Sequence, residues 1–468
     1  MSTSGSENRP NIVFIMSDDH AAHAISAYGS AINETPQIDR IANEGARFDN
    51  CFCTNSICAP SRATILTGVH SHLNGVLTLA DDIDGRQDTF PKRLQGAGYQ
   101  TAIFGKWHLG HGGNADPTGF DRWAVLPDQG LYHDPEFFVM GERTRFEGYV
   151  TDLITDFSLD WLKERDRDRP FMLAVHHKAP HRPWEPDEKH MGMYEDIDIP
   201  LPPTFDDDYE NRSNAAKNAK MRIESDLNFT DVKADVPEGL SPAERKNWLY
   251  QRYIKDYLRC VASIDDNVGR VLDYLDAEGI ADDTVIIYTS DQGFFLGDHG
   301  WYDKRFMYEE SLRMPFVMRY PREIPAGSVV DAMVTNVDFA PTFLDYAGQP
   351  PADRMQGASF RRIAAGEEPP ADWPTAMYYR YWMHLAHHHV PAHYGIRTAR
   401  YKLIYYYGEA LGTTESIDEP TPPEWELFDL EKDPMEMHSV YADPEYAGVV
   451  RELTDELYRL KAHYGDER

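Results

Sequence analysis

Four short, almost wholly apolar runs limit the possible folds of this chain more than any other feature. They are NIVFIM at residues 11–16, QTAIF at 100–104, FMLAV at 171–175 and TVIIYT at 284–289. A strand that reads as a continuous apolar run is buried on both faces, as in parallel sheets covered by helices. Stretches with helical spacing of apolar residues lie between these runs, at residues 35–48, 89–99, 151–165 and 248–278. The sequence therefore predicts an α/β fold.

The remaining regions differ in character from this alternating pattern. Residues 185–246 are polar and rich in proline, and we expect them to form a cover with short elements of its own. Residues 363–375 read as a boundary, and the aromatic runs that follow, within 376–407, predict antiparallel strands. A closing helix is expected at 445–464. We therefore predict a larger domain over residues 1–370 and a smaller α+β subdomain over residues 371–468.

The composition excludes some partners. Asp and Glu number 78 against 46 Lys and Arg, a formal net charge of −32. This charge disfavours nucleic acid and anionic membranes as partners. No run approaches the length of a membrane span, and the first residues lack an apolar leader. Cys51, Cys53, Cys58 and Cys260 are too few for a disulfide framework, so we expect a reducing, cytoplasmic location.

Polar side chains follow each of the four apolar runs. They are Asp18 and Asp19, Lys106 and His108, His181, and Asp291 and Gln292. Parallel strands present their carboxyl ends at one edge of a sheet, so these side chains are expected to meet there. Carboxylate and amide oxygens suit Ca²⁺ or Mg²⁺. The alternative is that the acids only cap helices, but two adjacent buried acids would repel each other without a cation or proton between them.

A second group of residues is cationic and surrounds a cysteine. Pro60 suits the first turn of a helix, which places Cys58 at a helix N-terminus. Taken alone, Cys58 would be read as a buried core residue. Positive groups expected near it, together with a metal, would bind a tetrahedral oxyanion such as a sulfate or phosphate ester. These groups are Arg62, Lys106, His108, His181 and Lys304.

Several motifs together resemble the type I, formylglycine-dependent sulfatases of the alkaline phosphatase superfamily. They are Cys58-Ala59-Pro60-Ser61-Arg62 with Thr67-Gly68, Ser17-Asp18-Asp19, Gly105-Lys106-Trp107-His108-Leu109-Gly110, Ala179-Pro180-His181, Ser290-Asp291-Gln292-Gly293, and Gly297-Asp298-His299-Gly300 before Lys304. The resemblance implies an alkaline-phosphatase-like mixed, mostly parallel sheet flanked by helices. Residues 1–370 would form the catalytic domain, and the C-terminal subdomain would contribute to the substrate pocket.

The same resemblance implies the chemistry of the site. Cys58 is expected to be converted to formylglycine by a generating enzyme that reads Cys-x-Pro-x-Arg, and its hydrate would attack sulfur. One divalent metal is expected, Ca²⁺ first, with Mg²⁺ or Mn²⁺ as alternatives. Its ligands would be Asp18, Asp19, Cys58, Asp291 and Gln292, although many relatives have Asn at the last position. Catalytic roles are implied for Cys58, Arg62, Lys106, His108, His181 and Lys304.

The C-terminal region resembles that of carbohydrate sulfatases, with the closest resemblance to N-acetylglucosamine-6-sulfatases. The expected substrate is therefore a sulfated saccharide, with aryl sulfates also accepted. Histidines in this region are read as packing or surface residues before substrate contacts: His384, His387, His388, His389 and His393. Two alternatives stay open, a phosphonate monoester or phosphodiester hydrolase of the same superfamily and a non-catalytic binder of sulfated glycans in which Cys58 stays a thiol.

Overall fold

A ten-stranded sheet lies at the centre of the computed structural model, which describes residues 9–468. Its strands, in spatial order, are β13 (Ser328–Val330), β2 (Ala46–Phe48), β12 (Phe316–Arg319), β9 (Thr284–Ser290), β1 (Asn11–Ser17), β8 (Phe171–His176), β4 (Gln100–Lys106), β5 (Arg122–Leu126), β6 (Glu136–Val139) and β7 (Glu142–Arg145). The four strands predicted from apolar runs are the neighbours β9, β1, β8 and β4, and they run parallel. Antiparallel pairing begins outside them, at β12 on one side and β6 on the other. The prediction of a mixed, mostly parallel sheet is confirmed.

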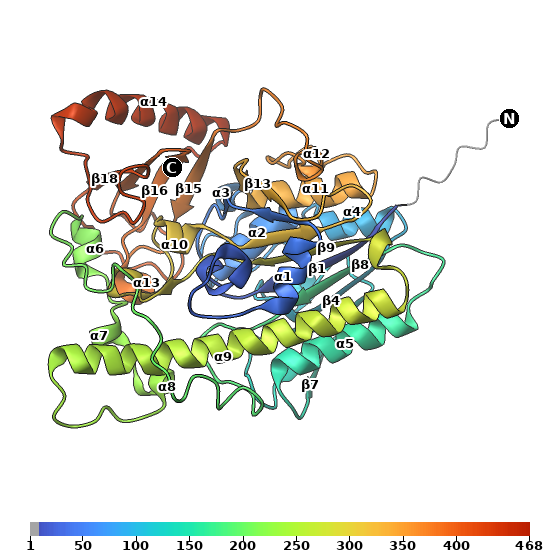
Figure 1. Cartoon of the computed structure of the whole chain (residues 1–468). Helices are drawn as coiled ribbons and strands as arrows, with labels where there is room; N and C mark the ends of the chain where they lie inside the picture. The colour runs from blue at the N-terminus through green and yellow to red at the C-terminus, as the bar shows by residue number, and fades with distance from the viewer. Residues whose placement is uncertain (1–8) are drawn as a thin grey trace.

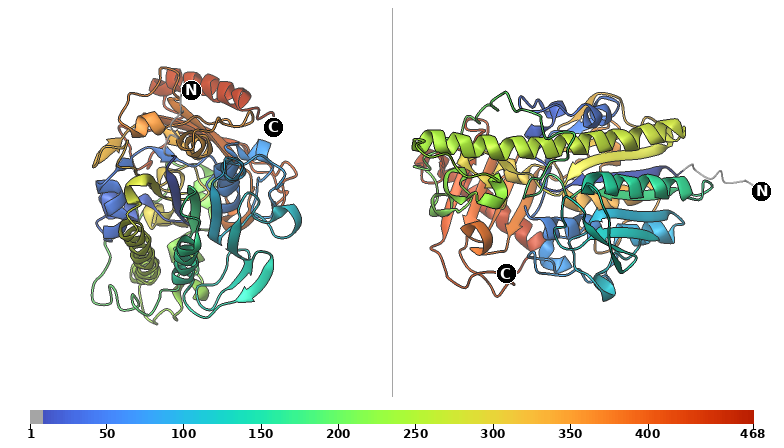
Figure 2. Two further views of the ribbon diagram at one scale, coloured as in Figure 1. Left: turned by 90° about the vertical axis from the view of Figure 1, so that its right-hand side faces the viewer. Right: turned by 90° about the horizontal axis from the view of Figure 1, so that it is seen from below.

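Helices cover both faces of this sheet (Figure 1). The long helix α9 (Pro242–Ala277) packs beside α5 (Val150–Glu164) and α1 (Pro36–Asn43), and Figure 2 shows α9 and α5 side by side along the sheet. The helices α2 (Cys58–Thr67), α4 (Phe90–Gly96) and α11 (Phe339–Tyr346) pack against one another elsewhere on the sheet. Phe14 of β1 contacts Phe343 of α11 with ring centroids 5.1 Å apart. The sheet is thus buried on both faces, as its continuous apolar strands require.

A second, four-stranded sheet follows near the C-terminus (Figure 1). It consists of β15 (Ala376–Tyr381), β16 (His393–Thr398), β17 (Tyr401–Tyr406) and β18 (Glu424–Asp429), all antiparallel. Helix α14 (Ala447–His463) closes over it by burying Leu453, Leu457 and Leu460. This is the α+β arrangement expected from the sequence, while the division at residue 370 stays a prediction.

Three expectations about element boundaries were wrong. The helix expected over 35–48 ends at Asn43, and residues 46–48 form β2. A Cβ atom on Gly45 would lie 2.1 Å from the Met318 carbonyl oxygen, so the glycine lets the chain turn close against β12. Helix α9 begins at Pro242, six residues earlier than expected, because Ser241 and Glu244 form a capping box. Lys106, which the glycines on either side of Lys106 and His108 predicted to lie in a loop after the strand at residues 100–104, is instead the last residue of β4.

The polar segment 185–246 contains three short helices, α6 (Asn214–Asn218), α7 (Ile223–Asp226) and α8 (Phe229–Val232). Arg182, next to His181, binds Asp231 of α8 with an Nε to Oδ1 distance of 3.0 Å. This contact holds the segment against the edge of the sheet where the polar side chains gather. Within residues 9–468, no helix is long and apolar enough to span a bilayer. The four cysteines are buried and free of disulfides, as expected.

Candidate active site

Cys58 opens helix α2, with Ile57 as the N-cap residue and Pro60 in the first turn. Its side chain is 1% exposed, and its sulfur lies 3.3 Å from Asp18 Oδ1. Burial raises the pKa of the Cys58 thiol, and the neighbouring Asp18 carboxylate raises it further. The group at this position is therefore a protonated thiol, which is a weak nucleophile.

Two adjacent strands bring the acids together. The register pairs Ser17 of β1 with Ser290 of β9, so the residues that follow each strand are neighbours. The Asp19 backbone N–H donates to Asp291 Oδ1 at 3.2 Å. Asp18, Asp19 and Asp291 each offer a carboxylate oxygen within 4.8 Å of the others, and all three residues are 0% exposed. The predicted convergence of strand ends is therefore present.

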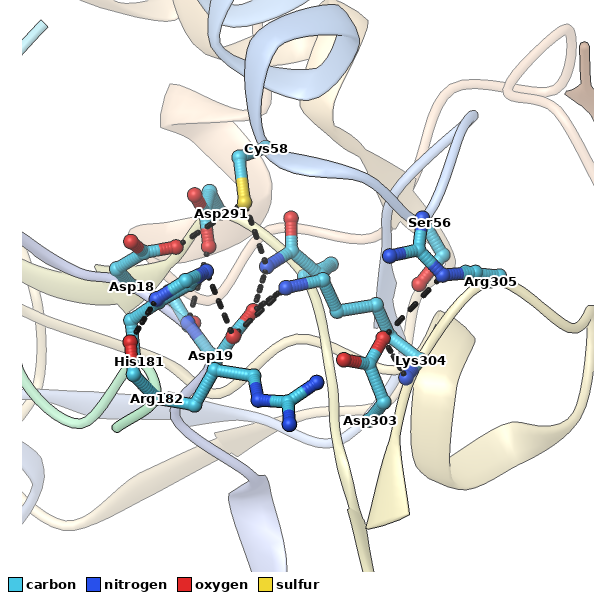
Figure 3. Close-up of polar contacts among 12 residues, drawn as sticks. Asp18, Asp19, Ser56, Cys58, His181, Arg182, Asp291, Asp303, Lys304 and Arg305 are labelled. Atoms are coloured by element: carbon cyan, nitrogen blue, oxygen red, sulfur yellow. Dashed lines mark hydrogen bonds and ion pairs between the residues drawn. The ribbon is translucent and has the colours of Figure 1, made fainter. Parts of the chain in front are cut away.

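Three buried cations face these three acids. Lys106 donates to Asp18, and Arg62 Nε donates to Asp291 Oδ2 at 2.9 Å. Lys304 Nζ lies 2.6 and 2.7 Å from the two oxygens of Asp19 (Figure 3). The formal charges of the six side chains therefore cancel. A substrate anion would upset this balance unless it arrived with a cation.

The pKa values of the acids reflect this arrangement. Burial opposes ionisation of Asp18, but the combined attraction of Lys106, His181, Arg62 and Lys304 outweighs it and holds the Asp18 pKa well below its usual range. Burial raises the pKa of Asp19 to about 6, against the attraction of Lys304. Burial and repulsion by Asp18 raise the pKa of Asp291 to about 7. Three carboxylates this close are costly to ionise together, and a divalent cation would remove that cost.

The donor set fits such a cation. Asp18, Asp19 and Asp291 supply hard oxygen ligands, and Gln292 follows Asp291 at the same strand end. The Gln292 amide nitrogen donates to Asp19, while its Oε1 is buried without a hydrogen-bond partner. An unpartnered buried oxygen beside three carboxylates is a further potential ligand for a hard divalent cation.

Two histidines lie beside the acids, each in a defined tautomer. His181 Nδ1 donates to the Arg182 carbonyl at 2.6 Å, so its Nε2 faces the site, 3.8 Å from Asp19 Oδ2. In Figure 3, His181 and Lys304 approach Asp19 from opposite sides. The His108 Nε2 lies 3.5 Å from the amide nitrogen of Gln129 and can only accept from it. Burial, followed by repulsion from Lys106, holds the pKa of both histidines well below the usual range.

The structure adds two groups that the sequence did not single out. Gln129 accepts from Lys106 through Oε1 and reaches His108 through Nε2, so it couples two predicted site residues. Lys178 is buried 4.6 Å from the centre of the Tyr132 ring, and burial lowers its pKa to about 8. Gln129 was missed because strand β5, which precedes it, was not predicted. The signal was present as the apolar run WAVL followed by PDQG, another strand ending in polar residues.

All ten predicted site residues lie at this one edge of the sheet. The roles assigned to them are predictions that the geometry alone does not test. Among the C-terminal histidines, His384 and His393 are 0% exposed and pack inside the structure, as expected. His388 instead contacts Asp303, the neighbour of Lys304.

Comparison with known families identifies the chain. The model of the family described as Sulfatase matches residues 10–349, which is most of the chain. The chain belongs to the sulfatase family. A second model, described as the C-terminal part of N-sulphoglucosamine sulphohydrolase, matches residues 297–463 of this sulfatase. The fold, the family and the hydrolase class inferred from the motifs are thus confirmed.

Individual relatives cover nearly the whole chain. An N-acetylglucosamine-6-O-sulfatase from Bacteroides thetaiotaomicron is 44% identical, over 98% of this chain and 87% of the relative. A solved structure in complex with its substrate D-glucosamine-2-N,6-O-disulfate is 43% identical, with a TM-score of 0.91 over 98% of this chain and 99% of that one. A phosphonate monoester hydrolase from Agrobacterium radiobacter shares the fold, with a TM-score of 0.74 and 22% identity over 97% of this chain and 96% of that one.

Proposed function

We propose that this sulfatase hydrolyses a sulfate monoester of an amino sugar, using an oxygen nucleophile made from Cys58 and one divalent metal. The observation that carries this proposal is the arrangement around Cys58. Three buried acids and three buried cations, one of them Arg62 of the same helix, lie around it, and all six charges are paired. Such a site is suited to an anion that binds together with a divalent cation.

The metal would be held by Asp18, Asp19, Asp291, Gln292 and the modified residue 58. We propose Ca²⁺, with Mg²⁺ and Mn²⁺ as alternatives, because the ligands are hard oxygens. When bound, the cation would offset the charge of the carboxylates and stabilise negative charge on the sulfate. Lys106, Lys304 and Arg62, now paired with the acids, could then turn part of their hydrogen bonding toward the substrate.

Conversion of Cys58 to formylglycine is supported by the state of the thiol. Because its raised pKa keeps the thiol protonated, the unmodified side chain would attack sulfur poorly. The aldehyde hydrate would supply a nucleophilic oxygen at the same place, beside Asp18. Maturation would then require a partner enzyme that reads Cys58-Ala59-Pro60-Ser61-Arg62.

The two histidines suit opposite proton-transfer roles. His108 is unprotonated at Nε2, where its lone pair accepts only a long bond from Gln129, so this nitrogen would take the proton that must leave when sulfate is expelled and the aldehyde is restored. His181 carries its proton at Nδ1, so it must gain a second proton at Nε2 before it can protonate the leaving oxygen. The negative charge of a bound sulfate ester would favour that second proton.

The substrate class is supported by the relatives at 44% and 43% identity, whose names specify sulfated glucosamine derivatives. We propose a 6-sulfated N-acetylglucosamine or a related sulfated saccharide, with aryl sulfates as artificial substrates. The C-terminal region would line part of the saccharide pocket. The four buried cysteines, none in a disulfide, support a reducing and therefore cytoplasmic location.

The test compares ester classes under one metal. Turnover of N-acetylglucosamine-6-sulfate and 4-nitrophenyl sulfate is measured against a phenylphosphonate monoester and an aryl phosphodiester. We expect the sulfate esters to be the faster substrates, and a dominant rate on the phosphorus esters would overturn the proposal. Peptide mass analysis around Cys58 provides the second readout, because an unmodified thiol in fully active protein would exclude the proposed nucleophile.

A further inference from the structure

His388 lies where three distant segments meet. It belongs to the short segment α13 (Ala386–His389) between β15 and β16. Its Nε2 lies 3.1 Å from Asp303 Oδ2, in the turn that carries Lys304, and its Nδ1 lies 2.8 Å from the Lys220 carbonyl oxygen in the 185–246 segment. The Lys220 N–H donates back to the His388 carbonyl at 2.7 Å. One imidazole therefore links the C-terminal region and the covering segment to the active site.

The two partners of the imidazole determine its charge. A backbone carbonyl oxygen and a carboxylate oxygen only accept hydrogen bonds. Both bonds can form together only if His388 carries a proton on each nitrogen, as an imidazolium. Asp303 is the matching anion, because burial is outweighed by the attraction of His388 and Arg305, which hold the Asp303 pKa well below its usual range.

Asp303 in turn shapes the segment that holds Lys304. Its Oδ1 accepts the Lys304 backbone N–H at 2.9 Å and lies 3.4 Å from Arg305 Nε (Figure 3). Asp303 and Arg305 have φ angles of 78° and 91°, which residues other than glycine rarely adopt. A strained turn of this kind persists only where its surroundings hold it. Lys304, between these two residues, is the cation bound to Asp19.

We propose that doubly protonated His388 is a positioning residue that latches the C-terminal region onto the Asp303–Arg305 turn and so fixes Lys304 for the reaction. The inference rests on the proposed function only through the role of Lys304. Besides Asp303, Tyr302 packs edge-on against the His388 ring with centroids 5.4 Å apart, and His387 adjoins it on its own segment, while Lys304 and Arg305 act on Asp303. An imidazole with a single proton could keep only one of these two bonds, and the turn would then lose a contact that holds it.

The first test replaces His388 with Asn, which tolerates its φ of 55° but is too short to reach Asp303. The same change at His389, where φ is 56°, is the matched control. We expect His388→Asn to lower kcat about tenfold, the scale of one lost charge-assisted hydrogen bond, while KM changes little and His389→Asn keeps wild-type kinetics. An unchanged kcat in His388→Asn, or an equal loss in His389→Asn, would overturn the latch.

Two further measurements separate the latch from the proposed function. Amide hydrogen exchange of residues 302–305 should be faster in His388→Asn than in His389→Asn, whether or not any sulfate ester is turned over. Adding imidazole to His388→Gly should restore turnover only below the pKa of free imidazole and should leave His389→Gly unchanged. Unchanged exchange together with absent rescue would exclude the latch. A wild-type enzyme inactive on every sulfate ester would instead exclude the proposed function.

Discussion

Two buried lysines of this protein, Lys304 and Lys402, lie in comparable surroundings, but we expect Lys304 to act in the reaction and Lys402 to stabilise the fold. Lys304 Nζ binds both oxygens of Asp19 at 2.6 and 2.7 Å. Lys402 in β17 is 0% exposed and lies 2.9 Å from Glu309 and 2.7 Å from Glu436. Each lysine therefore has two carboxylate oxygens around one ammonium group in the protein interior. Burial and charge alone do not distinguish a functional cation from a structural one.

The difference lies in how the acids are grouped. Around Lys304, three aspartates approach one another so closely that their oxygens fall within 4.8 Å, and such groups of three were found in the described part of the chain only at this site. Around Lys402, one ammonium group contacts both Glu309 and Glu436, and Arg397 also binds Glu309; we call these four residues the Lys402 cluster. The two glutamates at Lys402 share one cation and form no group of three ligands. The three aspartates near Lys304 offer oxygens within 4.8 Å of one another, with their cations bound around them, and so could hold a further small cation.

The largest expected effect is the loss of the nucleophile. Cys58→Ala leaves both lysine clusters in place, so in metal-free protein we expect a melting temperature close to that of wild type. Turnover of sulfate esters by metal-loaded enzyme should fall by at least about a thousandfold, as for other lost nucleophiles. Steady-state kinetics and thermal unfolding of the same preparation measure the two quantities. Activity retained in Cys58→Ala would refute the role assigned to residue 58.

The next effect compares the two lysines directly through the same substitution. In metal-loaded enzyme, Lys304→Met should lower kcat/KM by about a hundredfold or more, because a fixed donor to the sulfate is lost, and should change stability less, because the metal supplies positive charge beside Asp19. Lys402→Met should instead lower the free energy of unfolding by about 3–5 kcal/mol, the cost of leaving buried acids unpaired. Its kcat per folded molecule should stay near the wild-type value. Denaturant unfolding and active-site-normalised kinetics distinguish the two outcomes, and similar profiles for both variants would contradict the comparison.

Metal removal should lower the melting temperature through the aspartates that bind the metal and not through the Lys402 cluster, and this effect should be smaller than those of the substitutions above. A ligand that binds only the folded state at a hundred times its Kd adds about 2.7 kcal/mol of stability. We therefore expect a chelator to lower the melting temperature of wild type and of Glu436→Gln by similar amounts. Asp291→Asn, which removes one predicted ligand, should show little response. A full chelator response in Asp291→Asn would exclude Asp291 as a metal ligand.

The sequence predicted the active-site cluster but not the Lys402 cluster, and the reason is physical. Asp18 and Asp291 directly follow apolar strands, and Lys106 is the last residue of one. Parallel strands bring their carboxyl ends together whatever the length of the loops between them. Glu309, Lys402 and Glu436 come from a short helix, an antiparallel strand and a turn, and no local pattern relates them. The contact between His388 and Asp303 spans 85 residues and depends on turns with positive φ at non-glycine residues, which leave no periodic signal.

The smallest effect concerns a single proton in the Lys402 cluster. Burial raises the pKa of Glu436 from 4.5 to about 7, against the attraction of Lys402. A carboxyl group whose pKa is raised on folding favours the folded state fully below its unfolded pKa, and that contribution is lost as pH rises through the folded value. Glu436 therefore makes the protein less stable as pH rises from about 4.5 to 7.

The isosteric change Glu436→Gln removes this proton, so denaturant unfolding across that range should show a flatter dependence on pH than wild type. At neutral pH we expect a change within about 1 kcal/mol, because the amide keeps the shape of the side chain. Glu426→Gln is the control for the loss of a buried glutamate. Glu426 lies in β18, in the same sheet as Lys402, but it does not pair with Lys402. A flattening of equal size in Glu426→Gln would mean that the pH dependence does not arise at Glu436.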